Sequence, residues 1–212
     1  MSGPYGVPMP FPMRRPTGLF GRFGSYIQSR STEEQWFHGG IGCTSPTASA
    51  QTINVLKTCP VVFPRDVVID QISFNVTAAG GVGSVSMIGV YDTEGDFSKW
   101  YPSRLLWNSL SLDTRTNTGV LKNSCIIPCE ANRLYWLAFT CGTAAPTCRC
   151  ATNAGAWPIG GWDHLLGTTP GNFVTVSSTY SANGMPTIYP RGGTFPSSSG
   201  PFMPILAMRF AS

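Results

Sequence analysis

Apolar residues in this chain recur at every second position from about residue 50 onward, a period typical of strands and not of helices. The stretch VVIDQISFNVTAA (67–79) is apolar on one face and increasingly polar on the other, as in a half-buried strand. Strict alternation places Ile72 and Phe74 on one face and Ile69 on the opposite face. RLYWLAFTCG (133–142) is apolar on both faces, so we expect it in the centre of a sheet.

Seven further segments have the same character and are separated by turn signals rich in glycine, proline, serine and asparagine. They are 52–58, 84–91, 104–113, 119–127, 147–152, 172–179 and 204–210. Only STEEQWF (31–37), with the capping pattern Ser31–Glu34, suggests a short helical turn. The sequence therefore predicts an all-β fold, an antiparallel β-sandwich of jelly-roll type.

The composition agrees with many short strands, because only 11% of the residues are charged while glycine numbers 24 and proline 18. A chain of 212 residues suits one all-β domain and an additional arm. We place the boundary after residue 35, with an extended arm over 1–35 and the β-sandwich over 36–212.

The first 30 residues carry the whole excess of positive charge. They contain four arginines and no acid, whereas 31–212 contain ten basic and ten acidic residues, so the net charge of +4 lies in residues 1–30. The proline and glycine content of the arm excludes a long helix, and its apolar side chains favour a protein groove over nucleic acid or a free tail. The expected anchoring residues are Phe11, Arg14, Arg15, Phe20, Arg22 and Phe23.

Nothing in the sequence predicts passage through a membrane or into an oxidising compartment. No apolar run approaches the roughly 18 residues of a membrane span, and no secretory signal is visible. The seven cysteines are an odd number, which argues against a disulfide framework and for buried thiols in a protein made in the cytoplasm.

Residues suited to catalysis or metal binding are few. Asp163 and His164 are neighbours in the chain, which does not make their side chains meet. Asp92, Glu94 and Asp96 have a calcium-like spacing, but no glutamate follows at the twelfth position, so a solvated turn is the default. The pairs Cys125/Cys129 and Cys148/Cys150 have spacings that could serve zinc, and burial explains them equally well. We expect no enzyme activity, no cofactor and no metal.

Two loops rich in aromatic residues, 93–103 and 153–171, offer a second type of site. Aromatic rings provide flat apolar area that suits sugar rings, and loops at one end of a sandwich can form a binding rim. The candidate receptor- or glycan-binding residues are Trp100, Tyr101, Trp157 and Trp162. The alternative is that these rings close the ends of the core.

Several short stretches, in order along residues 50–210, together resemble a β-sandwich module of tailed-bacteriophage virion proteins. Arg133 departs from that pattern, because glycine is usual before the Tyr-Trp pair. The resembling stretches are VVFPRDVVIDQISFNVT, IGVYD, YPSRLLWNS, TNTGV, RLYWLAF, AAPTCR, NGMPTIY and FMPILAMRF.

This resemblance implies a non-enzymatic virion component, of the tail-fibre, receptor-binding, head-fibre or capsid-decorating kind, commonly trimeric. It implies that the arm joins the sandwich to other capsid or tail proteins and that the protein resides in the virion. The alternatives are a carbohydrate-binding adhesin of the tail and a jelly-roll coat protein whose basic arm contacts the genome.

Overall fold

The computed structural model describes residues 36–38, 46–63, 65–94, 101–151, 174–194 and 203–211. All regular secondary structure in these ranges is strand, which confirms the all-β prediction. The strands are β1 (Trp36–His38), β2 (Pro46–Ala50), β3 (Val55–Val62), β4 (Val67–Ala78), β5 (Val85–Glu94), β6 (Tyr101–Asn108), β7 (Leu112–Asp113), β8 (Gly119–Cys129), β9 (Leu134–Gly142), β10 (Thr147–Ala151), β11 (Val174–Ser177) and β12 (Ala207–Phe210).

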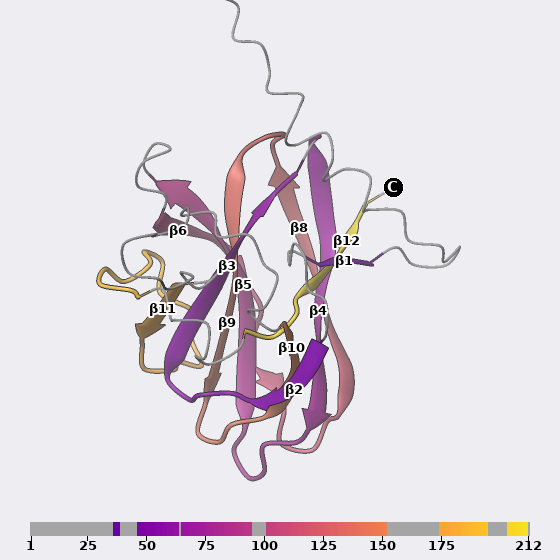
Figure 1. Cartoon of the computed structure of the whole chain (residues 1–212), viewed down its shortest axis with the longest axis vertical. Coiled ribbons are helices and arrows are strands. Elements are labelled where there is room, and N and C mark those ends of the chain that lie inside the picture. Colours follow the sequence, from indigo (N-terminus) through magenta and orange to yellow (C-terminus); the bar gives the residue numbers. More distant parts are fainter. Residues whose placement is uncertain are drawn as a thin grey trace, which may run out of the picture.

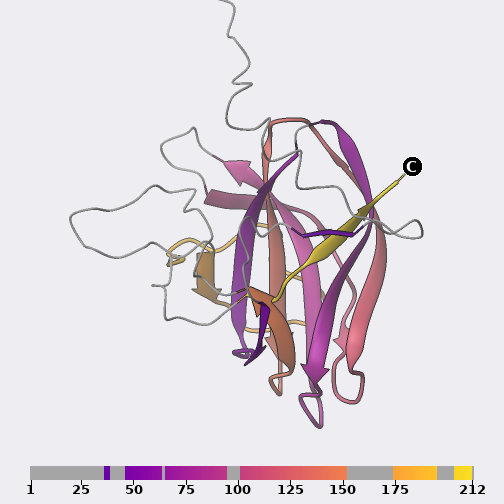
Figure 2. The ribbon, with the colours of Figure 1, turned by 45° about the vertical axis from the view of Figure 1, so that its right-hand side comes forward.

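The strands form two antiparallel sheets that pack face to face as a β-sandwich (Figures 1 and 2). In the first, sheet A, β8 pairs along one edge of β4 from Val67 to Val76. The other edge of β4 is shared by β12, which pairs with Ile69–Ser73, and β10, which pairs with Val76 and Ala78. β2 extends the sheet beyond β10, and β1 extends it beyond β12.

In the second sheet, sheet B, β9 lies between β3 and β5, while β11 pairs outside β3 and both β6 and β7 pair outside β5. All nine residues of β9 are buried, so the central position expected for this segment is confirmed. The chain crosses from one sheet to the other at each step from β2 to β5 and again from β7 to β10. Strands β2 to β5 and β7 to β10 therefore alternate between the two sheets, whereas β5, β6 and β7 all belong to sheet B.

The main core fills the space between the two sheets. Ile72 and Phe74 of β4 face Leu137 and Phe139 of β9, and all four side chains are at most 2% exposed. The rings of Phe74 and Phe139 meet edge to face at 5.4 Å. Burial of each such side chain stabilises the fold by about 1.5–3 kcal/mol, so this layer fixes how the sheets stack.

A second apolar cluster covers the outer face of sheet B. Tyr91 and Trp136 of this face are buried beneath Met185 and Tyr189, which belong to the irregular segment 178–194. This segment also bonds to the edge of β6, because Leu105 N donates to Thr187 O (2.8 Å) and Tyr189 N donates to Ser103 O (2.7 Å). It protects both a face and an edge of the sheet.

The prediction of strict alternation in β4 is wrong at one point. Its pairing with both β8 and β12 shifts register around Asp70. As a result, Ile69 and Ile72 are both fully buried, although strict alternation places them on opposite faces. A β-bulge of this kind inserts an extra residue, so side chains beyond it point to the opposite face from the one that strict alternation predicts.

Two other sequence predictions are corrected. Residues 104–113 belong to two strands instead of one. Ser109 N donates to Ile88 O (2.8 Å) and Ser109 Oγ accepts from Ile88 N (3.0 Å), and β6 ends before this residue. Trp36 and Phe37, expected within a helical turn, belong to strand β1 and pair with β12.

Four turns, 51–54, 79–84, 114–118 and 143–146, lie at one end of the sandwich, which we call the turn end (the lower end in Figures 1 and 2). Backbone bonds join them in two pairs: Gln51 N donates to Pro146 O (2.9 Å), and Gly80 N donates to Thr114 O (3.0 Å). Ser84 Oγ, which donates to Ala144 O (2.8 Å), links one pair to the other.

Candidate functional site

Most residues that the sequence singled out for function lie outside the described residues. This holds for all six anchoring candidates, Phe11, Arg14, Arg15, Phe20, Arg22 and Phe23, and for Trp100, Trp157 and Trp162. Asp96, Asp163 and His164 also lie outside them. The anchoring and aromatic-rim hypotheses therefore stay predictions.

Tyr101, at the start of β6, is the one aromatic-rim candidate among the described residues. Its hydroxyl donates to Pro190 O (2.8 Å) and accepts from Gly193 N (3.0 Å). The Tyr189 ring meets it edge to face at 5.5 Å, and the Arg191 guanidinium carbon lies 5.6 Å from its ring centroid. These contacts hold the segment 186–193 against sheet B.

Two of the three carboxylates with calcium-like spacing, Asp92 and Glu94, are paired with arginines. Asp92 of β5 is 7% exposed and receives two bonds from Arg133 Nη2, at 2.8 and 2.6 Å, while Arg104 Nη2 lies 3.8 Å away. Glu94 pairs with Arg191. Asp92 accordingly ties β5 to the chain before β9, and Arg133, the departure from the phage-like pattern, supplies its main partner.

The thiols are mainly packing groups. Cys125, Cys129, Cys141, Cys148 and Cys150 are buried in the core between the sheets. Within the described residues, no group of three or more histidine, cysteine, aspartate or glutamate side chains is arranged to hold a metal ion. Burial raises the pKa of Cys125, Cys141 and Cys150 to about 11, so these thiols stay protonated at neutral pH.

A buried lysine lies beside three of these thiols and was missed by the sequence analysis. Lys57 of β3 is 1% exposed, and its Nζ donates to Gln51 Oε1 at 2.7 Å. Gln51 Nε2 in turn donates to Ser49 O (3.0 Å) and to Cys150 Sγ (3.1 Å). Burial lowers the pKa of Lys57. The sequence did contain a signal for this burial: alternation along β3 places Lys57 on the same face of the strand as Cys59 and Val61.

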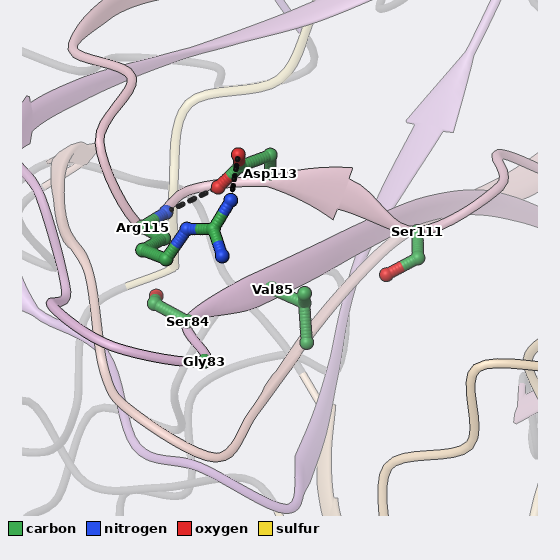
Figure 3. A pocket seen from close by; sticks show the side chains of 6 residues that line it. All are labelled: Gly83, Ser84, Val85, Ser111, Asp113 and Arg115. Atoms are coloured by element: carbon green, nitrogen blue, oxygen red, sulfur yellow. Dashed lines mark hydrogen bonds and ion pairs between the residues drawn. The ribbon is translucent and has the colours of Figure 1, made fainter.

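A small open hollow of about 210 Å³ lies at the turn end. Asp113 and Arg115 form its polar wall, since Arg115 N donates to Asp113 Oδ1 (2.8 Å) and Arg115 Nη2 lies 3.3 Å from Asp113 Oδ2. Figure 3 shows the Arg115 side chain folded back on Asp113, with Val85 between this pair and Ser111. Gly83 and Ser84 complete the lining.

The floor of the hollow is held by buried hydroxyls. Ser84 Oγ shares a 2.8 Å hydrogen bond with Thr114 Oγ1 and donates to Ala144 O at 2.8 Å. Gly83 has φ +77°, and a Cβ there would lie 2.7 Å from Thr143 Cγ2, so only glycine fits without rearrangement. This hollow was not predicted from the sequence, because its walls come from two separate segments of the chain.

No protein-family profile matches the sequence, and no curated protein matches it. Among the described residues, no helix is long and apolar enough to cross a membrane. The fold, the charge distribution and the turn end are therefore the features from which a function can be inferred.

Proposed function

We propose that this protein is a non-enzymatic structural component of a bacteriophage virion, a displayed β-sandwich held to a capsid or tail protein through residues 1–35. We further infer that the long strands have jelly-roll connectivity. The orders β2-β10-β4-β8 in sheet A and β3-β9-β5-β6 in sheet B, with alternating crossings, are the arrangement that two nested Greek keys produce.

The observation that carries the proposal is the distribution of charge. Every carboxylate among the described residues has a partner: Asp70, Asp92, Glu94, Asp113 and Glu130 pair with arginines, and Asp66 Oδ1 accepts from Ala131 N at 2.7 Å. The described part of the sandwich thus satisfies its own carboxylates and offers no unpaired one to a basic partner. The four arginines of 1–30 are uncompensated within their own segment, which supports docking on an acidic surface of another protein.

The test is incorporation of variants into particles. Deletion of residues 1–30 should leave a folded sandwich that no longer co-purifies with virions. A second variant, with Arg14, Arg15 and Arg22 replaced by glutamate, should lose incorporation to a similar extent, because reversed charge repels an acidic groove. The matched control is Arg65→Glu, since Arg65 is an exposed arginine of the sandwich.

Three results would contradict the proposal or change it. Normal incorporation without residues 1–30 would refute anchoring by the arm. Normal incorporation of the glutamate variant with loss in the Arg65→Glu control would move the contact to the sandwich. Steeply salt-dependent binding of the arm to nucleic acid, absent in the glutamate variant, would instead favour a coat protein that contacts the genome.

The expected homotrimer is part of the same proposal. Repeated copies on a particle strengthen weak individual contacts, because each later contact forms at a high effective concentration. Sedimentation equilibrium of the purified full chain measures this directly, and a monomer at all concentrations would exclude the trimer in solution.

A further inference from the structure

We propose that the hollow at the turn end is a binding subsite for a single neutral sugar ring. In this assignment sugar hydroxyls hydrogen-bond to Asp113 and Arg115, and the apolar face of the ring lies against Val85, the apolar side chain of the lining. The inference goes beyond the anchoring of the arm and does not depend on it, because the hollow lies in the sandwich.

The Asp113 and Arg115 side chains have unused bonding capacity, whereas Ser111 Oγ already shares a 2.8 Å hydrogen bond with the Tyr180 hydroxyl. Asp113 is 42% exposed, and a carboxylate offers about four acceptor sites, of which Arg115 uses two. The Arg115 side chain is 55% exposed, and a guanidinium has about five N–H donors. Donors and acceptors are therefore presented side by side, as a polyol requires.

The charge of the hollow favours a neutral ligand. Asp113 and Arg115 compensate each other at 3.3 Å, so neither an anion nor a cation gains a full opposite charge there. An anion would meet the Asp113 carboxylate, and a cation would meet the guanidinium. A sugar hydroxyl can donate to one group and accept from the other.

One apolar side chain belongs to the lining itself. Val85 is half-buried and lies between the Asp113–Arg115 pair and Ser111 (Figure 3). A sugar ring has one face of C–H groups and a rim of hydroxyls, which matches an apolar side chain beside a polar wall.

The geometry also limits the size of the ligand. A volume of about 210 Å³ is smaller than the roughly 300–1,000 Å³ of sites for drug-sized molecules, so the hollow suits one ring of a glycan. The bonds from Ser84 to Thr114 and Ala144 keep the floor rigid, so little ordering is needed on binding. Several copies on one particle would raise the avidity.

The experiment is titration of the ¹⁵N-labelled full chain with glucose, galactose, N-acetylglucosamine and sialic acid, followed by NMR chemical shifts. At least one neutral sugar should shift the amides of 83–85 and 111–115. Asp113→Asn retains an oxygen that can accept from Arg115 N, so the turn persists, and binding should weaken at least tenfold. The matched control is Asp66→Asn, which changes an aspartate that caps a backbone N–H at the opposite end and should leave binding unchanged.

Each remaining outcome counts against the proposal. It is overturned if no neutral sugar shifts these amides at about 50 mM, or if shifts appear there and persist unchanged in Asp113→Asn. Binding of sialic acid alone, lost in Arg115→Gln, would make the hollow an anion site instead. Because the isolated chain is used, failure here leaves the result of the incorporation experiment unaffected.

Discussion

Raising the pH from 8 to 10 is expected to lower the stability of the sandwich sharply, because its core holds five buried thiols that must stay protonated. Burial raises the pKa of Cys125, Cys141 and Cys150 from 9.0 to about 11 and that of Cys129 to about 12, and it also raises the pKa of Cys148. A pKa raised in the folded state adds stability that is complete below the unfolded pKa of 9.0. This stability is lost as the pH rises toward the folded value.

The magnitude follows from the size of the shifts. At pH 10 a thiol whose pKa moves from 9.0 to about 11 has lost about 1.4 kcal/mol of its contribution, or about 7 kcal/mol for the five. Lys57 acts in the opposite sense. Because its pKa is lowered in the folded state, its contribution to the stability rises with pH up to the unfolded pKa of 10.5. A single group that releases one proton adds at most about 2.7 kcal/mol between pH 8 and 10, so a net loss of about 4 kcal/mol remains.

The assay is urea unfolding followed by far-ultraviolet circular dichroism at pH 8, 9 and 10, with a non-thiol reductant present. Cys141→Ala should lower the stability at pH 8 and reduce the loss between pH 8 and 10 by about 1.4 kcal/mol, because one thiol no longer titrates. An unfolding free energy that is unchanged between pH 8 and 10 would refute the assignment of these thiols to a closed core.

Two further predictions concern the stability contributed by an ion pair and by a glycine in a turn. Arg133→Ala should lower the unfolding free energy by about 1–3 kcal/mol, because it leaves the buried Asp92 carboxylate without its main partner, whereas Arg115→Ala, whose partner is exposed, should cost less than about 1 kcal/mol. Equal effects in urea unfolding would contradict this. Gly83→Ala should cost about 1–3 kcal/mol more than Gly81→Ala, since both residues have positive φ but only Gly83 lacks room for a Cβ. Equal melting temperatures for the two alanine variants would exclude the close packing at Gly83.

The period-two pattern of apolar residues was sufficient for most of the strand assignments and for one position in the tertiary fold. The double-sided apolar run at 133–142 predicted a central strand, and β9 is buried along its whole length. Local pattern failed at Asp70, because a bulge depends on how two neighbouring strands pair and leaves no mark in the periodicity of one strand. It failed also at 104–113, where contacts to β5 end the strand at Ser109.

Candidate sites were less accessible from the sequence. Among the residues selected for their charge or their aromatic rings, only Tyr101 belongs to the part of the chain that the structure describes. Its hydroxyl and ring contact the segment 186–193. The hollow could not be predicted, because residues 83–85 and 111–115 meet only when β7 pairs with β5. Its polar side chains are ordinary turn residues when considered separately.

The sequence by itself determined that this chain forms strands, that it buries thiols and that its charge excess lies at residues 1–30. These features follow from the composition and from the alternation of apolar residues at every second position, and both are local properties of the chain. Only the tertiary structure decided which strands alternate between the sheets, that Lys57 is buried in the core and that Asp113 and Gly83 line one hollow. Those outcomes depend on pairing and burial between distant segments, and their energies arise only when the sheets close on each other.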